Sequence, residues 1–336
     1  MTDALSKLLE IRPWLMADGA TGTNLFAMGL EAGEPPELWN VDHPERISAL
    51  YRSFIEAGSD LILTNSFGGT RARLKLHNHQ DRAYELNRRA AELARAEADR
   101  AGRPVIIAGS MGPTGELLEP VGPLTHEAAV EMFEEQARGL LDGGADVLWA
   151  ETISSEEEMR AAAEAAARLG APFCGTMSFD TAGRTMMGVT PPGYAGIAPM
   201  LPKAPIAFGA NCGTGASDLV RTLLGLSAAA PDAVLIAKAN AGIPSYQDGK
   251  IVYSGTPELM ADYALLARDS GARIIGGCCG SKPEHIAAMR RALETTPPGG
   301  RRPSLEEVEA KLGAFTSADD GSAGAPPKRE GRRRRG

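Results

Sequence analysis

Residues 125–150 read THEAAVEMFEEQARGLLDGGADVLWA, a helical pattern followed at once by a short apolar run. Apolar residues recur at intervals of three and four from Val130 to Leu140, and glycines end the pattern before the run Val147–Ala150. A similar run, Val105–Ala108, precedes the helical stretch. The three segments predict a strand–helix–strand unit, which is typical of a parallel sheet.

The same unit repeats along most of the chain. Eight apolar runs predict strands at Trp14–Ala17, Asp60–Thr64, Val105–Ala108, Val147–Ala150, Phe173–Phe179, Ile206–Gly209, Val234–Ala237 and Arg273–Ile275. Their continuous apolar character suits strands that are buried on both faces. Eight alternations predict an α/β fold, a (β/α)8 TIM barrel, which needs about 250 residues. We therefore assign residues 1–295 to the barrel and residues 296–336, rich in Pro, Gly and Arg, to a mostly disordered tail.

Local signals predict where several other segments begin and end. Apolar spacing predicts a helix over Pro44–Ala57, and a cap followed by a proline begins another at Thr256. The pair Ser281 and Glu284 is typical of a capping box. Residues 304–312 predict one short helix within the tail. The Gly- and Pro-rich stretch 180–199 is expected to be a functional loop.

Composition excludes several classes of protein. The 336 residues carry a formal net charge of −8 and have a pI of about 5.3, whereas nucleic-acid binders usually show a basic footprint. The first 20 residues lack the pattern of a secretory signal, and no run approaches the roughly 18 apolar residues of a membrane span. Four cysteines in a chain of this length do not form a disulfide framework. We therefore expect a cytoplasmic protein without nucleic-acid or membrane partners.

Three of the four cysteines follow predicted strands. Cys212 lies in Gly-Ala-Asn-Cys-Gly after the sixth strand, and Cys278 and Cys279 lie in Gly-Gly-Cys-Cys-Gly after the eighth. Barrel enzymes place their chemistry at the carboxyl ends of the strands, and strands of the same parity contribute to the same layer. Three thiolates with one open position are the pattern of a catalytic zinc ion, which activates a bound thiol. Cys174 lies within a strand and is expected to be a small core residue.

The cysteines alone leave other interpretations open. They are consistent with buried inert thiols, or with a redox sensor in which Cys278 and Cys279 form a vicinal disulfide. From a different class of enzyme, Lys238 follows the seventh strand, where a lyase barrel places its Schiff-base lysine. The lyase interpretation leaves the three cysteines without a role.

Several ordered motifs carry a resemblance to a known family. They are Asp18-Gly-Ala-Thr-Gly-Thr23, Leu63-Thr-Asn-Ser-Phe67, Gly109-Ser-Met-Gly-Pro-Thr114, Ala150-Glu-Thr152, GANCG, KANAGIP and GGCCGSKPEHI. Across about residues 14–294 the chain resembles the homocysteine S-methyltransferases. That family includes betaine–homocysteine methyltransferases and the homocysteine-binding module of cobalamin-dependent methionine synthase.

The resemblance implies a role for individual residues. It implies that the three cysteines hold Zn²⁺ and that Asn240 is a labile fourth ligand, which homocysteine displaces. It implies that Asp18 and Glu151 bind the amino group of homocysteine. Further substrate-binding residues are expected at Gly19, Thr21 and Ser66. The expected reaction is zinc-dependent methyl transfer to homocysteine, which forms methionine.

The methyl donor is not fixed by these motifs. Betaine enzymes enclose a quaternary ammonium with aromatic rings, but this chain has Gly68 and Thr152 where such rings would stand. We therefore expect methylcobalamin carried by a separate corrinoid protein, with betaine or S-methylmethionine as the alternatives. If betaine were used, Trp39 and Tyr194 would be the substitute cage residues.

Overall fold

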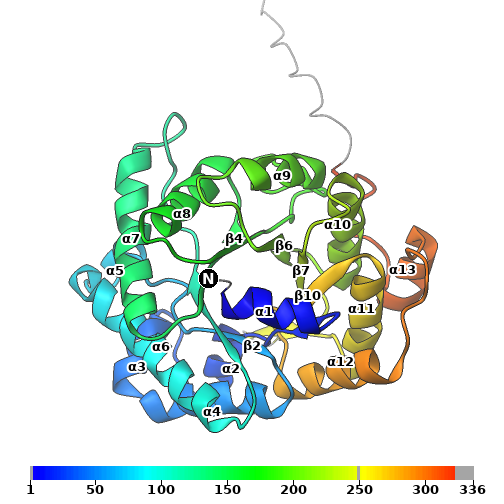
Figure 1. Ribbon diagram of the computed structural model, residues 1–336, viewed down its shortest axis with the longest axis horizontal. Helices are drawn as coiled ribbons and strands as arrows, with labels where there is room; N and C mark the ends of the chain where they lie inside the picture. The colour runs from blue at the N-terminus through cyan, green and yellow to red at the C-terminus, as the bar shows by residue number, and fades with distance from the viewer. Residues whose placement is uncertain (1–2, 248–249, 322–336) are drawn as a thin grey trace, which may run out of the picture.

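A computed structural model describes residues 3–247 and 250–321 of the chain. Eight parallel strands form one sheet in the order β1-β10-β7-β6-β5-β4-β3-β2. Their bounds are β1 Leu15–Met16, β2 Leu61–Leu63, β3 Ile106–Met111, β4 Val147–Ile153, β5 Phe173–Met177, β6 Ala207–Cys212, β7 Leu235–Ala239 and β10 Ala272–Gly277. A parallel bridge joins Ala17 to Leu61, and the Asp60 amide donates to the Met16 carbonyl at 2.7 Å. The sheet therefore curls into a TIM-like barrel (Figure 1), and all eight predicted strands are confirmed.

Helices surround the sheet and alternate with its strands. They are α1 Ala4–Ile11, α2 Gly22–Ala27, α3 Trp39–Asp42, α4 Pro44–Glu56, α5 Arg71–Lys75, α6 Ala83–Arg100, α7 His126–Asp142, α8 Glu156–Arg168, α9 Pro191–Ile197, α10 Ala216–Ala229, α11 Pro257–Asp269, α12 Pro283–Thr295 and α13 Leu305–Leu312. Short 3-10 turns cover Pro36–Leu38, Gln80–Arg82 and Ala198–Met200. Among the described residues, no helix is both long and apolar enough to cross a membrane.

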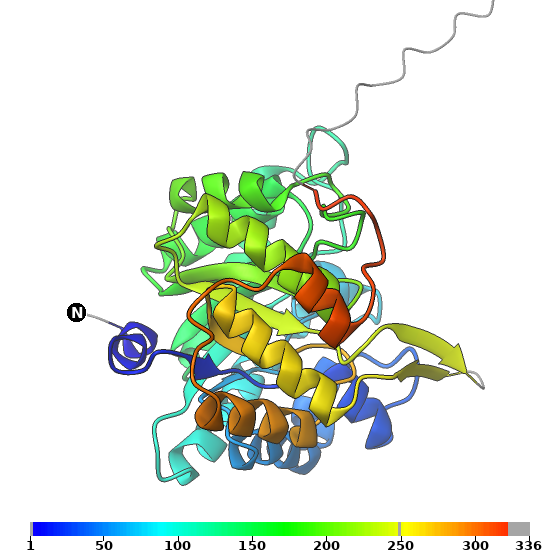
Figure 2. The same ribbon diagram turned by 90° about the vertical axis from the view of Figure 1, so that its right-hand side faces the viewer.

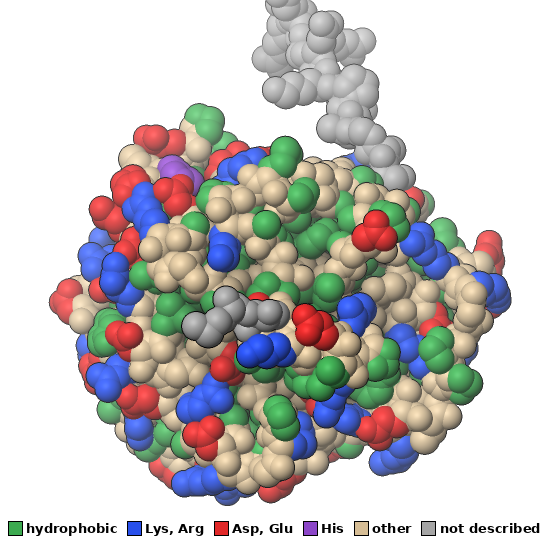
Figure 3. All heavy atoms as spheres, in the orientation of Figure 1, with side chains coloured by type: hydrophobic (Ala, Val, Ile, Leu, Met, Phe, Trp, Pro, Cys, Tyr) green, Lys and Arg blue, Asp and Glu red, His purple; other side chains and the backbone are tan. Residues whose placement is uncertain are grey.

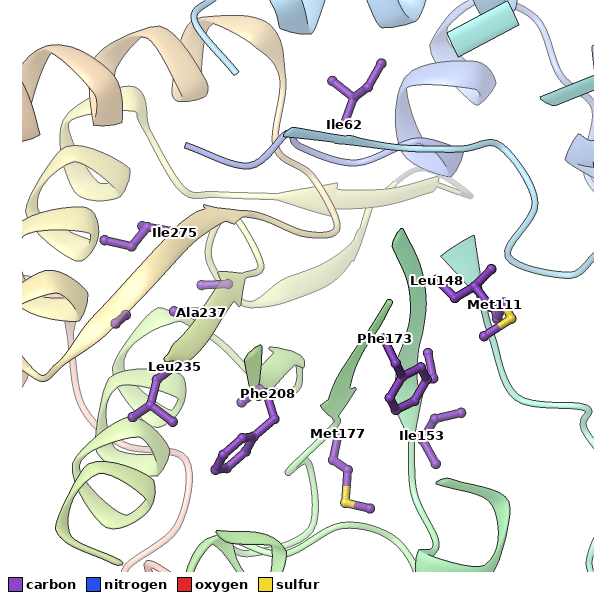
Figure 4. Packing of buried hydrophobic residues seen from close by; sticks show 14 of the residues in the cluster. Ile62, Met111, Leu148, Ile153, Phe173, Met177, Phe208, Leu235, Ala237 and Ile275 are labelled. Carbon is purple, nitrogen blue, oxygen red and sulfur yellow. The ribbon is translucent and has the colours of Figure 1, made fainter. Parts of the chain in front are cut away.

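The core has an inner and an outer part. Side chains such as Trp149 and Cys174 fill the barrel interior, and Leu5 and Leu8 of α1 join them. Helix α1 therefore closes one end of the barrel, where charged side chains of both signs are interspersed on the surface (Figures 1 and 3). Between the sheet and the helices, a larger cluster includes Phe173 and Phe208 (Figure 4). Cys174 is fully buried, as its position within a strand predicts.

Two local predictions are wrong at their boundaries. Helix α12 has Lys282 as its N-cap, and the Lys282 amide donates to His285 Nδ1 at 2.9 Å, so Ser281 and Glu284 form no capping box. Ser281 instead uses its carbonyl to accept from Ala20 and Asn24, which ties the loop after β10 to the start of α2. The stretch 180–199 is not an irregular loop throughout, because it contains α9, which Thr190 caps.

A hairpin interrupts the alternation after the seventh barrel strand. Strands β8 Pro244–Gln247 and β9 Lys250–Tyr253 pair antiparallel between β7 and α11. In the side view the hairpin projects from the end of the barrel opposite α1 (Figure 2). It therefore extends beyond the carboxyl ends of the strands.

The helix predicted over residues 304–312 is present as α13, with Ser304 and Glu307 forming a capping box. It packs against α10 and α11, and its Val308 and Leu312 are buried in the outer core (Figure 2). Beyond it, Thr316 Oγ1 donates to Asp218 Oδ2 at 2.7 Å. This part of the predicted tail therefore packs against the barrel, whereas residues 322–336 lie outside the described part of the chain.

Removing the segment from α13 to residue 321 should destabilise the barrel. A chain that ends at residue 303 should have a melting temperature several degrees below that of a chain that ends at residue 321. Burial of one large aliphatic side chain contributes about 1.5–3 kcal/mol, and the shorter chain loses two such side chains. Thermal unfolding followed by circular dichroism measures the difference. Equal melting temperatures would mean that α13 does not contribute to stability.

Candidate metal centre and substrate cavity

A cavity of about 540 Å³ opens at the carboxyl ends of the strands. Its lining includes the three clustered cysteines, Glu151, Lys238 and the start of α2. A larger hollow of about 750 Å³ lies beside Trp14, Arg268 and Pro297, away from the cysteines. The three cysteines and the charged side chains Glu151 and Lys238 therefore meet in the smaller cavity.

The sulfur atoms of Cys212, Cys278 and Cys279 all lie within 4.8 Å of one another. Cys212 is the last residue of β6, and the pair follows directly after β10 ends at Gly277. The Cys278 amide donates to the Ala239 carbonyl at 2.6 Å, and the Cys279 carbonyl accepts from the Ala241 amide at 2.9 Å. Both cysteines lie beyond the end of β10, where side chains no longer alternate between two faces, so two adjacent cysteines can present their sulfurs to one point. The predicted grouping of the three cysteines is confirmed.

Cys212 holds an unusual backbone conformation. Its φ angle is +60°, and Gly213 follows with a φ of +73°. A non-glycine residue in the left-handed region costs on the order of 1–3 kcal/mol and persists only where its surroundings hold it. Thr152, at an irregularity near the end of β4, has the same conformation, with a φ of +62°. Asn211 lies between them: its Oδ1 accepts from the Thr152 amide at 2.8 Å, and its Nδ2 donates to Thr152 Oγ1 at 2.7 Å.

The three thiols differ in their tendency to ionise: hydrogen bonds from Cys212 and Cys278 lower the pKa of Cys279, whereas the pKa values of the other two are raised. Hydrogen bonds to the other two cysteines, burial and the charges of those cysteines raise the pKa of Cys212. For Cys278, a hydrogen bond with Cys212 lowers the pKa. A hydrogen bond with Cys279, burial and the charge of Cys279 outweigh it and raise the pKa of Cys278 to about 12. A cation at the centre would remove this repulsion and allow all three sulfurs to be thiolates. The donor set therefore fits a soft or borderline metal ion such as zinc.

Asn240 lies in the chain between Ala239 and Ala241, whose backbone groups form hydrogen bonds with Cys278 and Cys279. Its Nδ2 donates to the Gly213 carbonyl at 2.8 Å, directly beside Cys212. Its Oδ1 is buried and has no hydrogen-bond partner among the described residues. A buried carbonyl oxygen without a partner is costly. The role of Asn240 as a labile fourth ligand stays a prediction.

Glu151 lines the cavity at the end of β4. Its Oε1 accepts a hydrogen bond from the Ser110 hydroxyl. Burial, reinforced by the charge of Cys278, raises the pKa of Glu151 to about 7, although the Lys238 ammonium opposes the shift. The carboxyl group can therefore change its protonation state near neutral pH.

Asp18 is almost completely buried, and both of its carboxylate oxygens have partners. Oδ1 forms an ion pair with the Lys238 ammonium, and Oδ2 accepts from the Leu63 amide at 2.7 Å. Lys238 lines the cavity, whereas Asp18 does not. The role predicted for Asp18 in substrate binding thus requires Lys238 to move. The same ion pair engages the nitrogen that would have to attack a carbonyl substrate, which disfavours the Schiff-base interpretation.

Gly19, Thr21 and Ser66 also line the cavity. A Cβ atom at Gly19 would lie 2.8 Å from the Phe54 ring and from the Ser281 carbonyl, so only glycine fits there. Thr21 begins α2 without capping it through its side chain. The Ser66 hydroxyl contacts Thr64 Oγ1 at 2.6 Å and the Ser110 carbonyl at 2.8 Å, which fixes it beside Glu151.

The substitute cage residues are not in the cavity. Trp39 is buried, and its ring packs 4.8 Å from His43 and beneath the Arg46 guanidinium. Tyr194 is fully buried and donates to the Gly175 carbonyl at 2.9 Å. Neither side chain can enclose a donor from these positions, so this part of the prediction is wrong.

Three residues of the site had no clear signal in the sequence. Asn211 looks like an ordinary neighbour of Cys212. Tyr253, at the end of the hairpin, lines the cavity, and its hydroxyl forms a hydrogen bond that favours the Cys279 thiolate. Glu37 is buried in the cavity wall, and its Oε1 accepts from the Gly68 amide at 2.6 Å. Only spatial proximity identifies them.

Known proteins share both the sequence pattern and the fold. The chain is 30% identical over 327 residues to a methionine synthase of Mycobacterium tuberculosis and 31% identical over 323 residues to that of Mycobacterium leprae. These matches cover 92% and 90% of this chain but only 27% and 26% of the relatives, so the chain spans about a quarter of their length.

Solved structures of the homocysteine methyltransferase MmuM from Escherichia coli are also similar. Its oxidized form matches with a TM-score of 0.71 and 26% identity, covering 86% of this chain and 99% of MmuM. Its metallated form gives the same TM-score and identity and covers 85% of this chain. Residues 15–293 match the profile described as Homocysteine S-methyltransferase, and the chain therefore belongs to the homocysteine S-methyltransferase family.

Proposed function

We propose that this protein transfers a methyl group to the thiol of homocysteine at a zinc site formed by Cys212, Cys278 and Cys279. The observation that carries the proposal is the meeting of three sulfur atoms within 4.8 Å at the mouth of the barrel. When bound, zinc would supply a Lewis acid that lowers the pKa of a substrate thiol. The Oδ1 atom of Asn240 is the protein group that we assign to the fourth position when no thiol is present.

The residues around the metal site are suited to orient an amino-acid thiol. Glu151 would accept a charge-assisted bond from the substrate ammonium, and the Ser110 hydroxyl holds one of its oxygens in place. The backbone around Gly19 and Thr21 would receive the substrate carboxylate. The sulfur lone pair then forms the new S–CH3 bond, the donor–methyl bond breaks with its electron pair staying on the donor, and the thiol proton leaves to solvent.

For the donor we propose methylcobalamin on a separate corrinoid protein. Gly68 and Thr152 line the cavity and provide no aromatic rings for a quaternary ammonium. The relatives named methionine synthase support the same choice, because the motifs of this chain follow that module.

A small cationic donor, betaine or S-methylmethionine, is the second candidate. It is favoured by one specific feature, the buried carboxylate of Glu37 in the cavity wall. The rings of Phe26 and Phe67 also line this cavity. A carboxylate and aromatic rings in the wall of one cavity are suited to a cation.

The metal assignment predicts about one zinc per chain in the purified protein. Substitution of Cys212, Cys278 or Cys279 by serine should each reduce the zinc content to a small fraction, because two thiolates hold the ion far less well than three. Elemental analysis by mass spectrometry measures the ratio. The matched control is Cys174→Ala, which removes a buried thiol away from the cluster and should keep its zinc. Full zinc occupancy in all three serine variants would contradict the assignment.

The substrate assignment predicts a weaker affinity for homocysteine in Glu151→Gln. The change should raise KM roughly tenfold or more, since hydrogen bonds to charged groups contribute about 1.5–3 kcal/mol. Zinc content should not change, which separates substrate binding from metal binding. An unaltered KM in a zinc-replete Glu151→Gln protein would show that this carboxylate is structural.

The donor assignment is tested by offering homocysteine with methylcobalamin, betaine or S-methylmethionine. We expect turnover with methylcobalamin, fastest when a corrinoid protein carries it, and little with the two small cations. Glu37→Gln should not affect the reaction with methylcobalamin. Robust turnover with a small cation, lost in Glu37→Gln, would instead establish the second candidate.

A further inference from the structure

The cavity wall contains a cation that the proposed reaction does not use. Lys238 is the penultimate residue of β7, and only 2% of its side chain is exposed. Its ammonium forms the ion pair with the Asp18 carboxylate and also donates to the Asp18 backbone carbonyl at 3.1 Å. A buried lysine is costly unless it is paired, so this contact is required by the fold of the site.

The ion pair removes Asp18 from the reach of other cations. With Oδ2 bound to the Leu63 amide and Oδ1 bound to Lys238, the carboxylate has no oxygen that lacks a partner. A substrate ammonium that displaced Lys238 would leave a buried cation without its partner, which is strongly destabilising. One charge-assisted bond contributes less than that. Exchange is therefore unfavourable.

Glu151 is then the carboxylate beside the cysteines that is available to a substrate ammonium. It lines the cavity and is partly exposed, whereas Asp18 lies behind Lys238. A substrate ammonium beside the cysteines would then bind one carboxylate rather than two, and it would contribute less to affinity. The thiol and carboxylate ends of a substrate would provide most of its affinity.

We propose that Lys238 is a specificity-determining residue that acts as a built-in ammonium, so that the site also accepts ω-mercapto carboxylates lacking an α-amino group. This inference rests on the proposed thiol methylation and concerns the class of acceptor. The Lys238 ammonium occupies the position beside Asp18 that the α-ammonium of an amino-acid substrate would otherwise take. The acceptor then needs a thiol and a carboxylate, and its amino group is a minor determinant.

The test compares homocysteine with 4-mercaptobutanoate, which is homocysteine without its amino group. Protein loaded with Co²⁺ in place of zinc is titrated with each thiol, and the visible absorption of the cobalt reports thiolate binding without any methyl donor. We expect homocysteine to bind about tenfold more tightly, which is the contribution of the single charge-assisted bond to Glu151. Recognition by two carboxylates would separate them by about a hundredfold or more, since each charge-assisted bond contributes about 1.5–3 kcal/mol.

Two variants isolate the role of the lysine. Lys238→Met frees Asp18 and should increase the preference for homocysteine about tenfold. The matched control Lys238→Met/Asp18→Asn removes both charges and should return the preference to that of the unmodified protein. The unmodified protein alone decides the proposal if a variant does not fold.

Three outcomes are distinguishable. A preference for homocysteine above about a hundredfold in the unmodified protein, or an unchanged preference in a folded Lys238→Met protein, would overturn the role of Lys238 while thiol binding stands. If neither thiol alters the cobalt spectrum, the proposed function fails and this inference fails with it. The expected difference of about tenfold between the dissociation constants, together with the expected shift in Lys238→Met, would support the proposal.

Discussion

The convergence of two strand ends on three sulfur atoms is the constraint on which the rest of the site depends. Cys212 ends β6, and Cys278 and Cys279 follow β10, yet their sulfurs lie within 4.8 Å of one another. Hydrogen bonds to the other two cysteines, burial and the charges of those cysteines raise the pKa of Cys212, and three thiolates this close would repel one another. A cation among the sulfurs would remove the repulsion between three thiolates. The folded backbone therefore positions ligands that repel one another in the absence of a metal ion.

Several contacts hold this arrangement from outside. A hydrogen bond from the Thr152 amide to Asn211 joins the strained residue Thr152 to the end of β6. A hydrogen bond from Asn240 to the Gly213 carbonyl joins the loop after β7 to the loop after β6. Farther out, Asp218 accepts from the side chains of Thr214 and Thr316, so the segment after α13 supports the loop that follows Cys212. These contacts restrict the backbone without contributing a ligand. Preorganisation of this kind reduces the cost of assembling the site when metal or substrate binds.

The sequence is sufficient to predict the barrel because buried parallel strands are short, apolar and regularly spaced. It also predicts the cysteine cluster, since glycine-flanked cysteines follow strands of the same parity. The partners of polar side chains are not predictable in the same way. Lys238 and Asp18 are 220 residues apart, and nothing local indicates that they pair. Serine is a common helix cap, but the Ser281 carbonyl instead accepts a hydrogen bond from Asn24 of α2. Tertiary contacts decide these cases.

The buried lysine also bears on the electrostatics of the whole site. With the proposed zinc bound, three thiolates and a divalent ion would carry a net negative charge, and a substrate thiolate would add to it. Asp18 would increase that charge further if it had no partner. Lys238 neutralises Asp18 and, at the same time, favours the ionised form of Cys278. Glu151 lies in the same field, and its raised pKa allows it to be neutral when no cation is bound. The ion pair therefore limits the negative charge of a site whose chemistry requires several anions close together.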